Sequence, residues 1–311
     1  MPSVERPEER PVEQAGSVRR IDPVAFMPAV FVLIWSTGFV VARLGMPHAP
    51  PLTFLSWRYA FSIIALTTWA LWSRAAWPST RSAWLHLSVT GLLLQAGYLG
   101  GVWSSVKLGL SAGTVALIVA LQPVLTAIYL ESRGGRGRVR PVQWLGLALG
   151  LAGVLLVVWG KLGLGEAGFW NVALAVVALL SITAGTLYQK ARVGAVDVRT
   201  AGVVQMIAAL VVTWPLSWME SQGMDWHAEL VVALGWSVLA LTMGANSLLY
   251  LLIQRGASMK VASMFYLVPP CTALMAWALF DEPLTLGLLV GLVLAAAGVA
   301  LVQRSAARSP T

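Results

Sequence analysis

Apolar stretches about 20 residues long alternate with short polar breaks along almost the whole chain. A helix of about 20 residues crosses the hydrocarbon core of a bilayer, so each stretch predicts one transmembrane helix. The breaks carry turn-forming sequences such as MPHAPP, WPST and RGGRGRVRP. The predicted spans are 24–43, 52–72, 83–106, 111–131, 141–160, 168–190, 199–219, 228–253, 259–280 and 284–303. The pattern therefore predicts an all-α membrane protein with ten transmembrane helices.

Composition agrees with this interpretation and excludes several other classes of protein. The chain is 58% hydrophobic and 11% charged, whereas soluble domains contain about 25% charged residues. The three histidines, His48, His86 and His227, have no metal-ligand spacing, and the single cysteine, Cys271, cannot form an intramolecular disulfide. No nucleophile elbow, nucleotide-binding loop or dinucleotide fingerprint is present. We therefore expect no enzymatic activity, no catalytic residue, no cofactor and no metal site.

The basic residues lie almost entirely on one side of the predicted arrangement. Apart from Arg58, inside the second span, only Arg43, Lys107 and Lys161 fall in odd-numbered loops; the other lysines and arginines lie in the tails and even-numbered loops. Cytoplasmic loops retain Lys and Arg, so we expect both termini in the cytoplasm. This asymmetry explains the net charge of +8 without a nucleic-acid partner.

The spans divide the chain into two halves with a tail at each end. Residues 1–23 mix Glu, Pro and Arg and predict a disordered cytoplasmic tail, not a signal peptide. Residues 24–160 and 161–303 each hold five predicted spans, and residues 304–311 form a cytoplasmic C-terminal tail.

The two halves resemble each other weakly when the sequence is shifted by 147 residues, or by 145 near the end of each half. Chance similarity of small residues in apolar helices is the alternative explanation. With five spans in each half, the second copy must enter the membrane upside down. Inverted repeats of this kind occur in many secondary transporters, which place a substrate site near the midplane and expose it alternately. The aligned pairs include Ser36 with Thr183, Arg43 with Lys190, Trp103 with Tyr250, Pro123 with Pro270, Gly146 with Gly291 and Gly153 with Gly298.

Four segments carry a resemblance to a known family: WSTGFVVARLG (35–45), FLSWRYAF (54–61), KLGLSAGTVALIVALQPVLTAI (107–128), and the long run from ASMKVASMFYLVPP to LAAAGVAL (257–301). Over residues 24–303 the chain resembles a ten-span member of the drug/metabolite transporter superfamily, of the EamA-domain type. The resemblance implies export or exchange of small metabolites, often amino acids, although sugar-phosphate and nucleotide-sugar carriers belong to the same superfamily. One departure is that the acidic turn DEP (281–283) has no counterpart in the first half.

Arg58 is the one charged residue in the interior of a predicted span. It lies about 9 Å along the second span, so its side chain can reach back to the interface. Alternatively it faces the interior of the bundle and holds a substrate carboxylate or a group of backbone carbonyls. The resemblance favours the interior, because an arginine is common in the second span of EamA-like proteins.

The other candidate site residues are uncharged. Each polar one could instead form an interhelical hydrogen bond without contacting substrate, and each tryptophan could pack towards lipid. Taken as a set, they favour a shared cavity between the halves. Pro123 and Pro270 are candidate helix breaks and gating positions, because proline frees carbonyls of the preceding turn. The candidate substrate-binding residues besides Arg58 are Trp35, Gln95, Trp103, Gln122, Tyr188, Asn246, Tyr250 and Tyr266.

The sequence therefore predicts a secondary transporter in the inner (plasma) membrane that moves a small amino-acid-like or amphipathic metabolite by alternating access, in the direction of export. Uptake or antiport of another metabolite is the alternative within transport, and a non-transporting or lipid-handling intramembrane protein is the alternative in a different class. No predicted span holds an acid in its middle, which disfavours coupling through a buried carboxylate. The expected partners are a small-molecule substrate and the lipid bilayer, with the protein a monomer or a homodimer.

Overall fold

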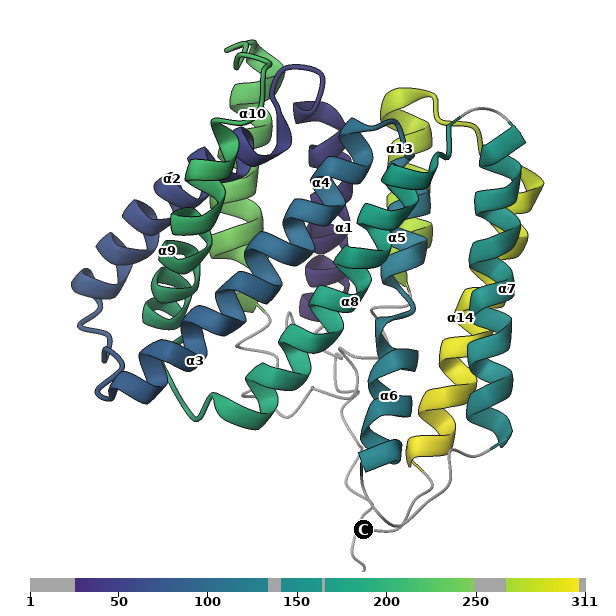
Figure 1. The fold of residues 1–311 in the computed structure, drawn as a ribbon, viewed down its shortest axis with the longest axis horizontal. Coiled ribbons are helices and arrows are strands. Elements are labelled where there is room, and N and C mark those ends of the chain that lie inside the picture. Colours follow the sequence, from purple (N-terminus) through teal and green to yellow (C-terminus); the bar gives the residue numbers. More distant parts are fainter. Residues whose placement is uncertain (1–25, 134–140, 164–165, 246, 249–266, 308–311) are drawn as a thin grey trace, which may run out of the picture.

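Every regular element in the described part of the chain is a helix (Figure 1). The computed structural model describes residues 26–133, 141–163, 166–245, 247–248 and 267–307. The first half contains α1 (Met27–Gly45), α2 (Pro51–Trp72), α3 (Arg81–Gly91), η2 (Leu92–Leu99), α4 (Gly100–Lys107), α5 (Ala112–Val119), α6 (Gln122–Arg133) and α7 (Pro141–Gly163). The second half contains α8 (Phe169–Arg192), α9 (Val198–Ser217), α10 (Ala228–Trp236), η3 (Ser237–Ala245), α13 (Val268–Phe280) and α14 (Leu286–Ala307).

Proline and short polar side chains start several of these helices. Pro51 opens α2, a position where no intrahelical partner exists for the missing N–H. The side chain of Thr80 accepts a hydrogen bond from the N–H of Ala83 at the start of α3, and Asp197 caps α9 in the same way. Helix α13 ends at Phe280, and the next residue, Asp281, caps it with a left-handed backbone at φ 53°. The starts of α2, α3 and α9 and the end of α13 therefore lie at polar breaks in the sequence pattern.

The third helix of each half contains a π-helical segment. In the first half α3, η2 and α4 run on without interruption, and in the second half α10 continues directly into η3. The two π-helical segments start about 145 residues apart, close to the offset that aligns the two halves. A π-helical segment departs from the regular hydrogen-bond ladder and is frequent at functional sites.

The fourth predicted span of the first half consists of two helices. Helix α5 ends at Val119, residues 120–121 form a turn, and α6 begins at Gln122 with Pro123 as its second residue. Because proline has no N–H and clashes with the preceding turn, the helix is interrupted there. In the second half α13 begins at Val268 and continues with Pro269 and Pro270. The residues at 249–266 lie outside the described part of the chain.

The two halves interlock through corresponding helices. Helix α7 packs along α14, and α2 packs along α9. The first helix of each half is embedded in the other half: α1 contacts α13, α10 and η3, and α8 contacts η2, α4 and α3. The largest hydrophobic core accordingly contains residues from both halves.

Four buried glycines hold α7 and α14 together. A Cβ atom on Gly153 would lie 2.6 Å from the carbonyl oxygen of Gly291, and one on Gly298 would lie 2.4 Å from that of Gly146. Small residues allow such close approach, which is how helices commonly associate in membranes. The repeat aligns Gly146 with Gly291 and Gly153 with Gly298. The contact of Gly153 with Gly291 therefore corresponds, after the two repeats are exchanged, to the contact of Gly298 with Gly146. Such exchange of partners is the pattern produced by a two-fold axis.

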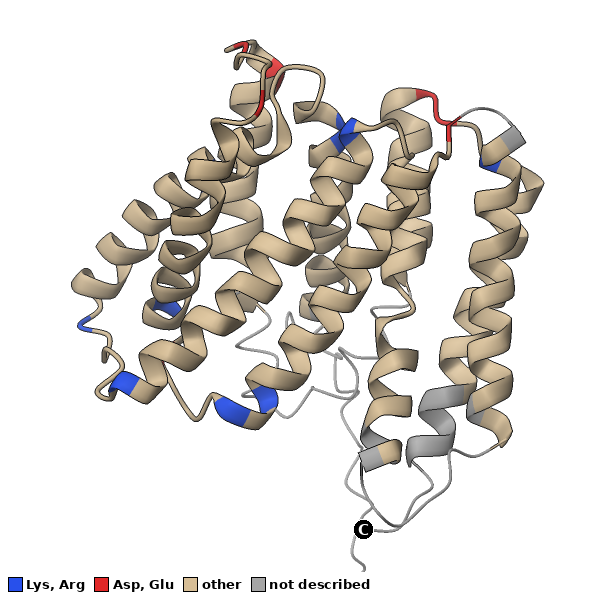
Figure 2. Cartoon of the chain, viewed as in Figure 1, with Lys and Arg blue, Asp and Glu red and all other residues tan. Residues whose placement is uncertain are grey.

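Charged side chains gather at two ends of the molecule (Figure 2). We call one of them the acidic end; it comprises the loops that follow α1, α4, α7, α9 and α13. The described acids of the acidic end are Glu166, Glu220, Asp225, Glu229, Asp281 and Glu282. The basic end comprises the loops that follow α2 and α8. Its described basic residues are Arg74, Arg81, Lys190, Arg192 and Arg199.

Within the described residues, six helices or runs of adjoining helices are long and apolar enough to cross a membrane. They are Arg81–Lys107, Ala112–Tyr129, Trp144–Leu162, Phe169–Arg192, Val198–Ser217 and Ala228–Ala245. Three shorter apolar helices are Ala29–Gly45, Val268–Phe280 and Leu286–Leu301. Helix α2, which carries Arg58, belongs to neither group.

We expect Gly298→Ala to destabilise the protein by about 1–3 kcal/mol, since the new methyl group overpacks a contact made of backbone on both sides. Gly160→Ala on α7 is the matched control, because nothing lies within 4 Å of a Cβ atom there. Thermal unfolding of the purified variants in detergent measures the difference. Equal melting temperatures for the two variants would show that α7 and α14 do not depend on this contact.

Candidate functional site

A polar cluster lies where α2 meets η2. Arg58 on α2 is 6% exposed, and its Nε has no hydrogen-bond partner among the described residues. The neighbouring Tyr59 donates from its hydroxyl to the backbone carbonyl of Gln95 on η2, 2.8 Å away. Tyr98, also on η2, is buried and close enough to interact electrostatically with the guanidinium. The cluster thus combines a buried cation, two tyrosines and the backbone of a π-helical segment.

Glycines on the third helix let the second half approach this cluster. A Cβ atom on Gly91 would lie 2.3 Å from the carbonyl oxygen of Gln205 on α9. One on Gly101 would lie 2.6 Å from the carbonyl oxygen of Leu174 on α8. The run from α3 to α4 therefore sits tightly between α8 and α9. Helix α2, which carries Arg58, also has neighbours in the second half, namely α9 and η3.

The second π-helical segment also presents polar groups to α2. The hydroxyl of Thr242 on η3 donates to the carbonyl of Ser237 at 3.0 Å, five residues back, and Ser62 on α2 donates to the Thr242 hydroxyl at 3.4 Å. The hydroxyl of Ser237 is buried without a partner among the described residues. Helix α2 is therefore flanked by both π-helical segments.

A second polar link joins α1 to α13. The buried Ser36 donates to the carbonyl of Val32 on its own helix at 2.7 Å and lies 3.4 Å from the carbonyl of Val268. In return, Thr272 donates to the carbonyl of Ser36 at 3.3 Å. Val268 and Thr272 belong to the first turns of α13, beside the two prolines. The start of α13 is thus hydrogen-bonded to the first helix of the other half.

Two predicted site residues form hydrogen bonds that involve α8: Gln122 bonds to a residue of α8, and Tyr188 belongs to α8 itself. The side-chain amide of Gln122, at the start of α6, donates to the hydroxyl of Thr186 at 3.1 Å. The hydroxyl of Tyr188 lies 2.8 Å from Nδ1 of His86 on α3. Both contacts join the two halves, but each is a closed pair rather than part of the Arg58 cluster.

The two predicted tryptophans have different environments. Trp103 is 1% exposed and its ring stacks on Phe54 with the centroids 4.3 Å apart, so it does not face lipid. Trp35 on α1 is half-buried, packs against the main core and lies 5.5 Å from the ring of Phe31. The predicted residues Asn246, Tyr250 and Tyr266 lie outside the described residues.

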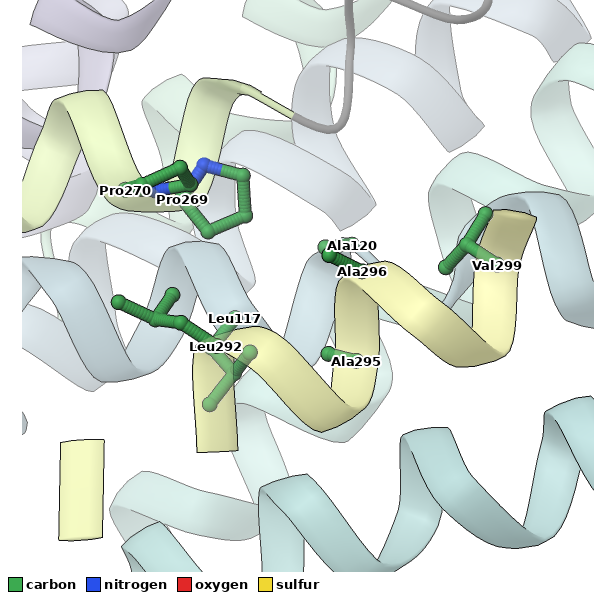
Figure 3. Close-up of a pocket in the computed structure, with 8 residues that line it drawn as sticks. All are labelled: Leu117, Ala120, Pro269, Pro270, Leu292, Ala295, Ala296 and Val299. Carbon is green, nitrogen blue, oxygen red and sulfur yellow. The ribbon is translucent and has the colours of Figure 1, made fainter. Parts of the chain in front are cut away.

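One of the two predicted helix breaks, Pro270, lies beside an apolar crevice (Figure 3). Pro269 and Pro270 at the start of α13 line it together with residues from the end of α5 and the middle of α14. Pro123 is not among the lining residues, although Ala120, in the turn before it, is. Within the described part of the chain, its lining has no charged or hydrogen-bonding side chain, so the crevice offers no recognition of a polar ligand. Its lining residues are Leu117, Ala120, Pro269, Pro270, Leu292, Ala295, Ala296 and Val299.

Sequence reasoning missed a set of contacts between the halves at the acidic end. The carboxylate of Glu220, after α9, accepts hydrogen bonds from the N–H groups of Leu52 and Thr53 at 2.9 and 2.8 Å and from the Thr53 hydroxyl at 2.9 Å. An acid from the second half therefore caps α2 of the first half. Only the tertiary structure could reveal it, because the partners are about 167 residues apart.

Glu282 and His48 form two further contacts of this kind. Glu282 lies 3.6 Å from Arg43, and burial raises the pKa of its carboxyl more than the arginine lowers it. His48 in the loop after α1 lies 2.9 Å from Glu229 and 3.5 Å from Asp225. The hydrogen bond to Glu229 raises the pKa of His48 above its usual value, against a smaller opposing effect of burial. These pairs join the first half to the second at the acidic end.

Comparison with known proteins identifies the family. The sequence model of the EamA-like transporter family matches residues 23–159 and again 169–304, once in each half. The chain belongs to this family. It is accordingly an all-helical, multi-pass membrane transporter of the drug/metabolite transporter superfamily with two EamA repeats, and not an enzyme.

Several relatives of this EamA protein are themselves described as transporters. The "Uncharacterized inner membrane transporter YedA" of Escherichia coli strain K12 is 28% identical over 79% of this chain and 80% of its own length. The "Uncharacterized transporter YvbV" of Bacillus subtilis strain 168 is 28% identical over 90% and 91%. The "Probable amino-acid metabolite efflux pump" of Salmonella typhimurium strain LT2 is 27% identical over 88% and 92%.

A solved crystal structure shares the fold of the EamA protein. It aligns over 92% of this chain and 99% of its own with a TM-score of 0.61. The two sequences are 18% identical, so the likeness shows the fold alone.

We expect Glu220→Ala to destabilise the EamA protein by about 1.5–3 kcal/mol, because it removes the charged acceptor for three hydrogen bonds at the start of α2. Glu220→Gln keeps one oxygen acceptor and the size of the side chain, so it should fall between wild type and the alanine variant. Thermal unfolding in detergent measures the series. A glutamine variant as unstable as the alanine variant would mean that the charge alone matters.

Proposed function

We propose that the protein crosses the membrane ten times, as two inverted repeats with both termini in the cytoplasm. The partner exchange of Gly146, Gly153, Gly291 and Gly298 supports a pseudo-two-fold relation between the repeats. The concentration of basic residues at one end supports a cytoplasmic basic end and an external acidic end. The inner membrane is the proposed location, as in the name of the YedA relative.

We further propose that the protein exports a small amino-acid-like or amphipathic metabolite as a secondary transporter with alternating access. The observation that carries this proposal is the buried position of Arg58 between the π-helical segment of one repeat and the helices of the other. A charged group inside a membrane protein is costly to bury and is usually functional. Export is supported by the relatives named as probable amino-acid metabolite efflux pumps from Salmonella typhimurium and Escherichia coli.

In this proposal Arg58 binds the carboxylate of the substrate. A guanidinium matches a carboxylate with two parallel hydrogen bonds, and the Nε of Arg58 is a donor without a partner among the described residues. Its 6% exposure favours a position inside the bundle over a side chain that reaches the membrane surface. Gln95 and Tyr98, on the facing π-helical segment, are the proposed neighbours of the bound substrate.

Alternating access requires each end to open in turn. At the acidic end the hydrogen bonds of Glu220 and the ion pairs of Arg43 and His48 bridge the repeats, so substrate release to the outside would break them. The interruption before Pro123 and the start of α13 at Pro269 and Pro270 are the proposed bending points. All described carboxylates lie in loops or at helix ends, which favours facilitated exit or exchange over coupling through a buried carboxylate.

Efflux from proteoliposomes preloaded with radiolabelled neutral, aromatic or acidic amino acids tests the proposal. We expect saturable efflux of at least one of them, lowered about tenfold or more by Arg58→Gln, because a hydrogen bond to a charged group contributes about 1.5–3 kcal/mol. Arg74→Gln, just after the end of the same helix and exposed, should leave efflux unchanged.

Thermal unfolding of each variant shows whether a loss of efflux comes from misfolding, and Arg58→Lys provides a second variant that keeps the charge. Efflux that survives Arg58→Gln in a folded protein would remove Arg58 from the pathway and shift the proposed site to Trp35, Trp103, Asn246 and Tyr250. Net accumulation from the outside would favour uptake or antiport. If none of these substrates is transported in either direction, the result would favour a lipid-handling or other non-transporting protein.

A further inference from the structure

Two histidines that are far apart in the sequence lie in contact at the acidic end. His48 belongs to the loop after α1, and His227 caps the start of α10. Their rings stack with the centroids 4.6 Å apart and the planes 10° from parallel. Glu229, in the first turn of α10, lies beside both, and its Oε2 is 2.9 Å from Nε2 of His48. One ligand atom from each of these three side chains lies within 4.8 Å of the others.

The loops that carry these side chains are held together by other contacts. The N–H of Asp225 donates to the carbonyl of His48 at 2.8 Å, which ties the two loops by their backbones. The ring of Trp226 packs edge-on against Trp57 of α2, with the centroids 5.9 Å apart. The position of the two histidines therefore does not depend on their own interaction.

We propose that His48, His227 and Glu229 bind a divalent transition-metal ion of the zinc class. Imidazole nitrogens and a carboxylate oxygen are ligands that Zn²⁺ prefers, and three protein ligands leave a fourth position for water. With bonds of about 2.0–2.1 Å, two ligands of a tetrahedral ion lie about 3.4 Å apart. The limit of 4.8 Å on the donor separations exceeds that value by about 1.4 Å, so binding requires the three side chains to draw together and the two stacked rings to turn their nitrogens towards one point.

Both histidines have nitrogen contacts that bear on this role. Nε2 of His48 faces the Glu229 carboxylate, while Nδ1 lies 3.5 Å from Oδ2 of Asp225. A carboxylate on the second nitrogen of a metal-binding histidine orients the ring and increases its basicity. Nδ1 of His227 accepts a long hydrogen bond of 3.4 Å from the N–H of Glu229, so it presents a lone pair. A metal ion bound to this nitrogen would replace the long hydrogen bond that caps the start of α10.

The ligands come from both EamA repeats, which gives the site a consequence for transport. His48 lies in the first repeat, and His227 and Glu229 lie in the second. A bound ion would join the repeats where the acidic end must separate to release substrate, so it would inhibit transport from the outside. This consequence rests on the proposed function, whereas metal binding itself does not.

Metal binding is tested with purified, tag-free protein in detergent. Titration with Zn²⁺ by calorimetry should give one equivalent, and Co²⁺ should give the visible absorption of a tetrahedral nitrogen–oxygen site. His48→Ala and His227→Ala should each lower the affinity by more than tenfold, and Asp225→Asn by about tenfold. His86→Ala is the matched control, because His86 is the third histidine of the chain and pairs with Tyr188 on α8. It should bind as wild type does.

Equal affinities in wild type, His48→Ala and His227→Ala would overturn the proposal, as would the absence of any Zn²⁺ binding by folded wild type. Thermal unfolding shows that each variant is folded. Efflux from proteoliposomes with Zn²⁺ added on either side then tests the consequence: inhibition from the external side alone, absent in His48→Ala, is expected. If the protein binds Zn²⁺ but transports nothing, the result would support the metal site and refute the proposed function.

Discussion

The structure depends above all on the need to satisfy backbone hydrogen bonds in a medium without water. A helix satisfies its peptide groups internally, so lipid-facing segments must be regular, and irregular backbone is tolerated only where protein surrounds it. The irregular places of this chain meet that condition. The carbonyl of Gln95, in a π-helical segment, accepts from the Tyr59 hydroxyl, and the carbonyl of Val268, at the start of α13, lies near the Ser36 hydroxyl. Within the described residues, both π-helical segments and the start of α13 also pack against the other repeat: η2 against α8 and α9, η3 against α1 and α2, and α13 against α1.

The same medium decides how the helices associate. Lipid tails are as apolar as leucine side chains, so close packing and interhelical hydrogen bonds hold the bundle together. The glycines of α7 and α14 allow backbone contact there, and Gly91 and Gly101 do so for the third helix. Arg58 differs in kind, because its burial adds a cost that packing does not offset. That difference is the physical reason for assigning it a function rather than a structural role.

Much of the fold could be predicted from the sequence because the signals are local. Apolar runs predicted the helices, and proline predicted the interruption before Pro123. The alignment of the two halves paired Gly146 with Gly291 and Gly153 with Gly298, but the contact of α7 with α14 was found only in the structure. The π-helical segments could not be predicted, since Leu92–Leu99 looks like any apolar helix. The proximity of His48 to His227 and the capping of α2 by Glu220 depend on the fold of the whole chain. The spacing of histidines along a sequence carries no information on such pairs.

The contacts between the repeats divide into two kinds with different strength. Those of α7 with α14 include close backbone contacts at Gly146, Gly153, Gly291 and Gly298, so separating the two helices would lose close packing along their length. Those at the acidic end are polar and only partly buried: an exposed ion pair contributes at most about 1 kcal/mol, and the hydrogen bonds of Glu220 contribute about 1.5–3 kcal/mol. An end held by a few such contacts can open against a free energy of a few kcal/mol, which is the range of ordinary conformational equilibria. In the proposed cycle α7 and α14 therefore stay together while the acidic end opens. A cation that bridges His48 and Glu229 would act on the one part whose stability is small enough to be changed by a single ligand.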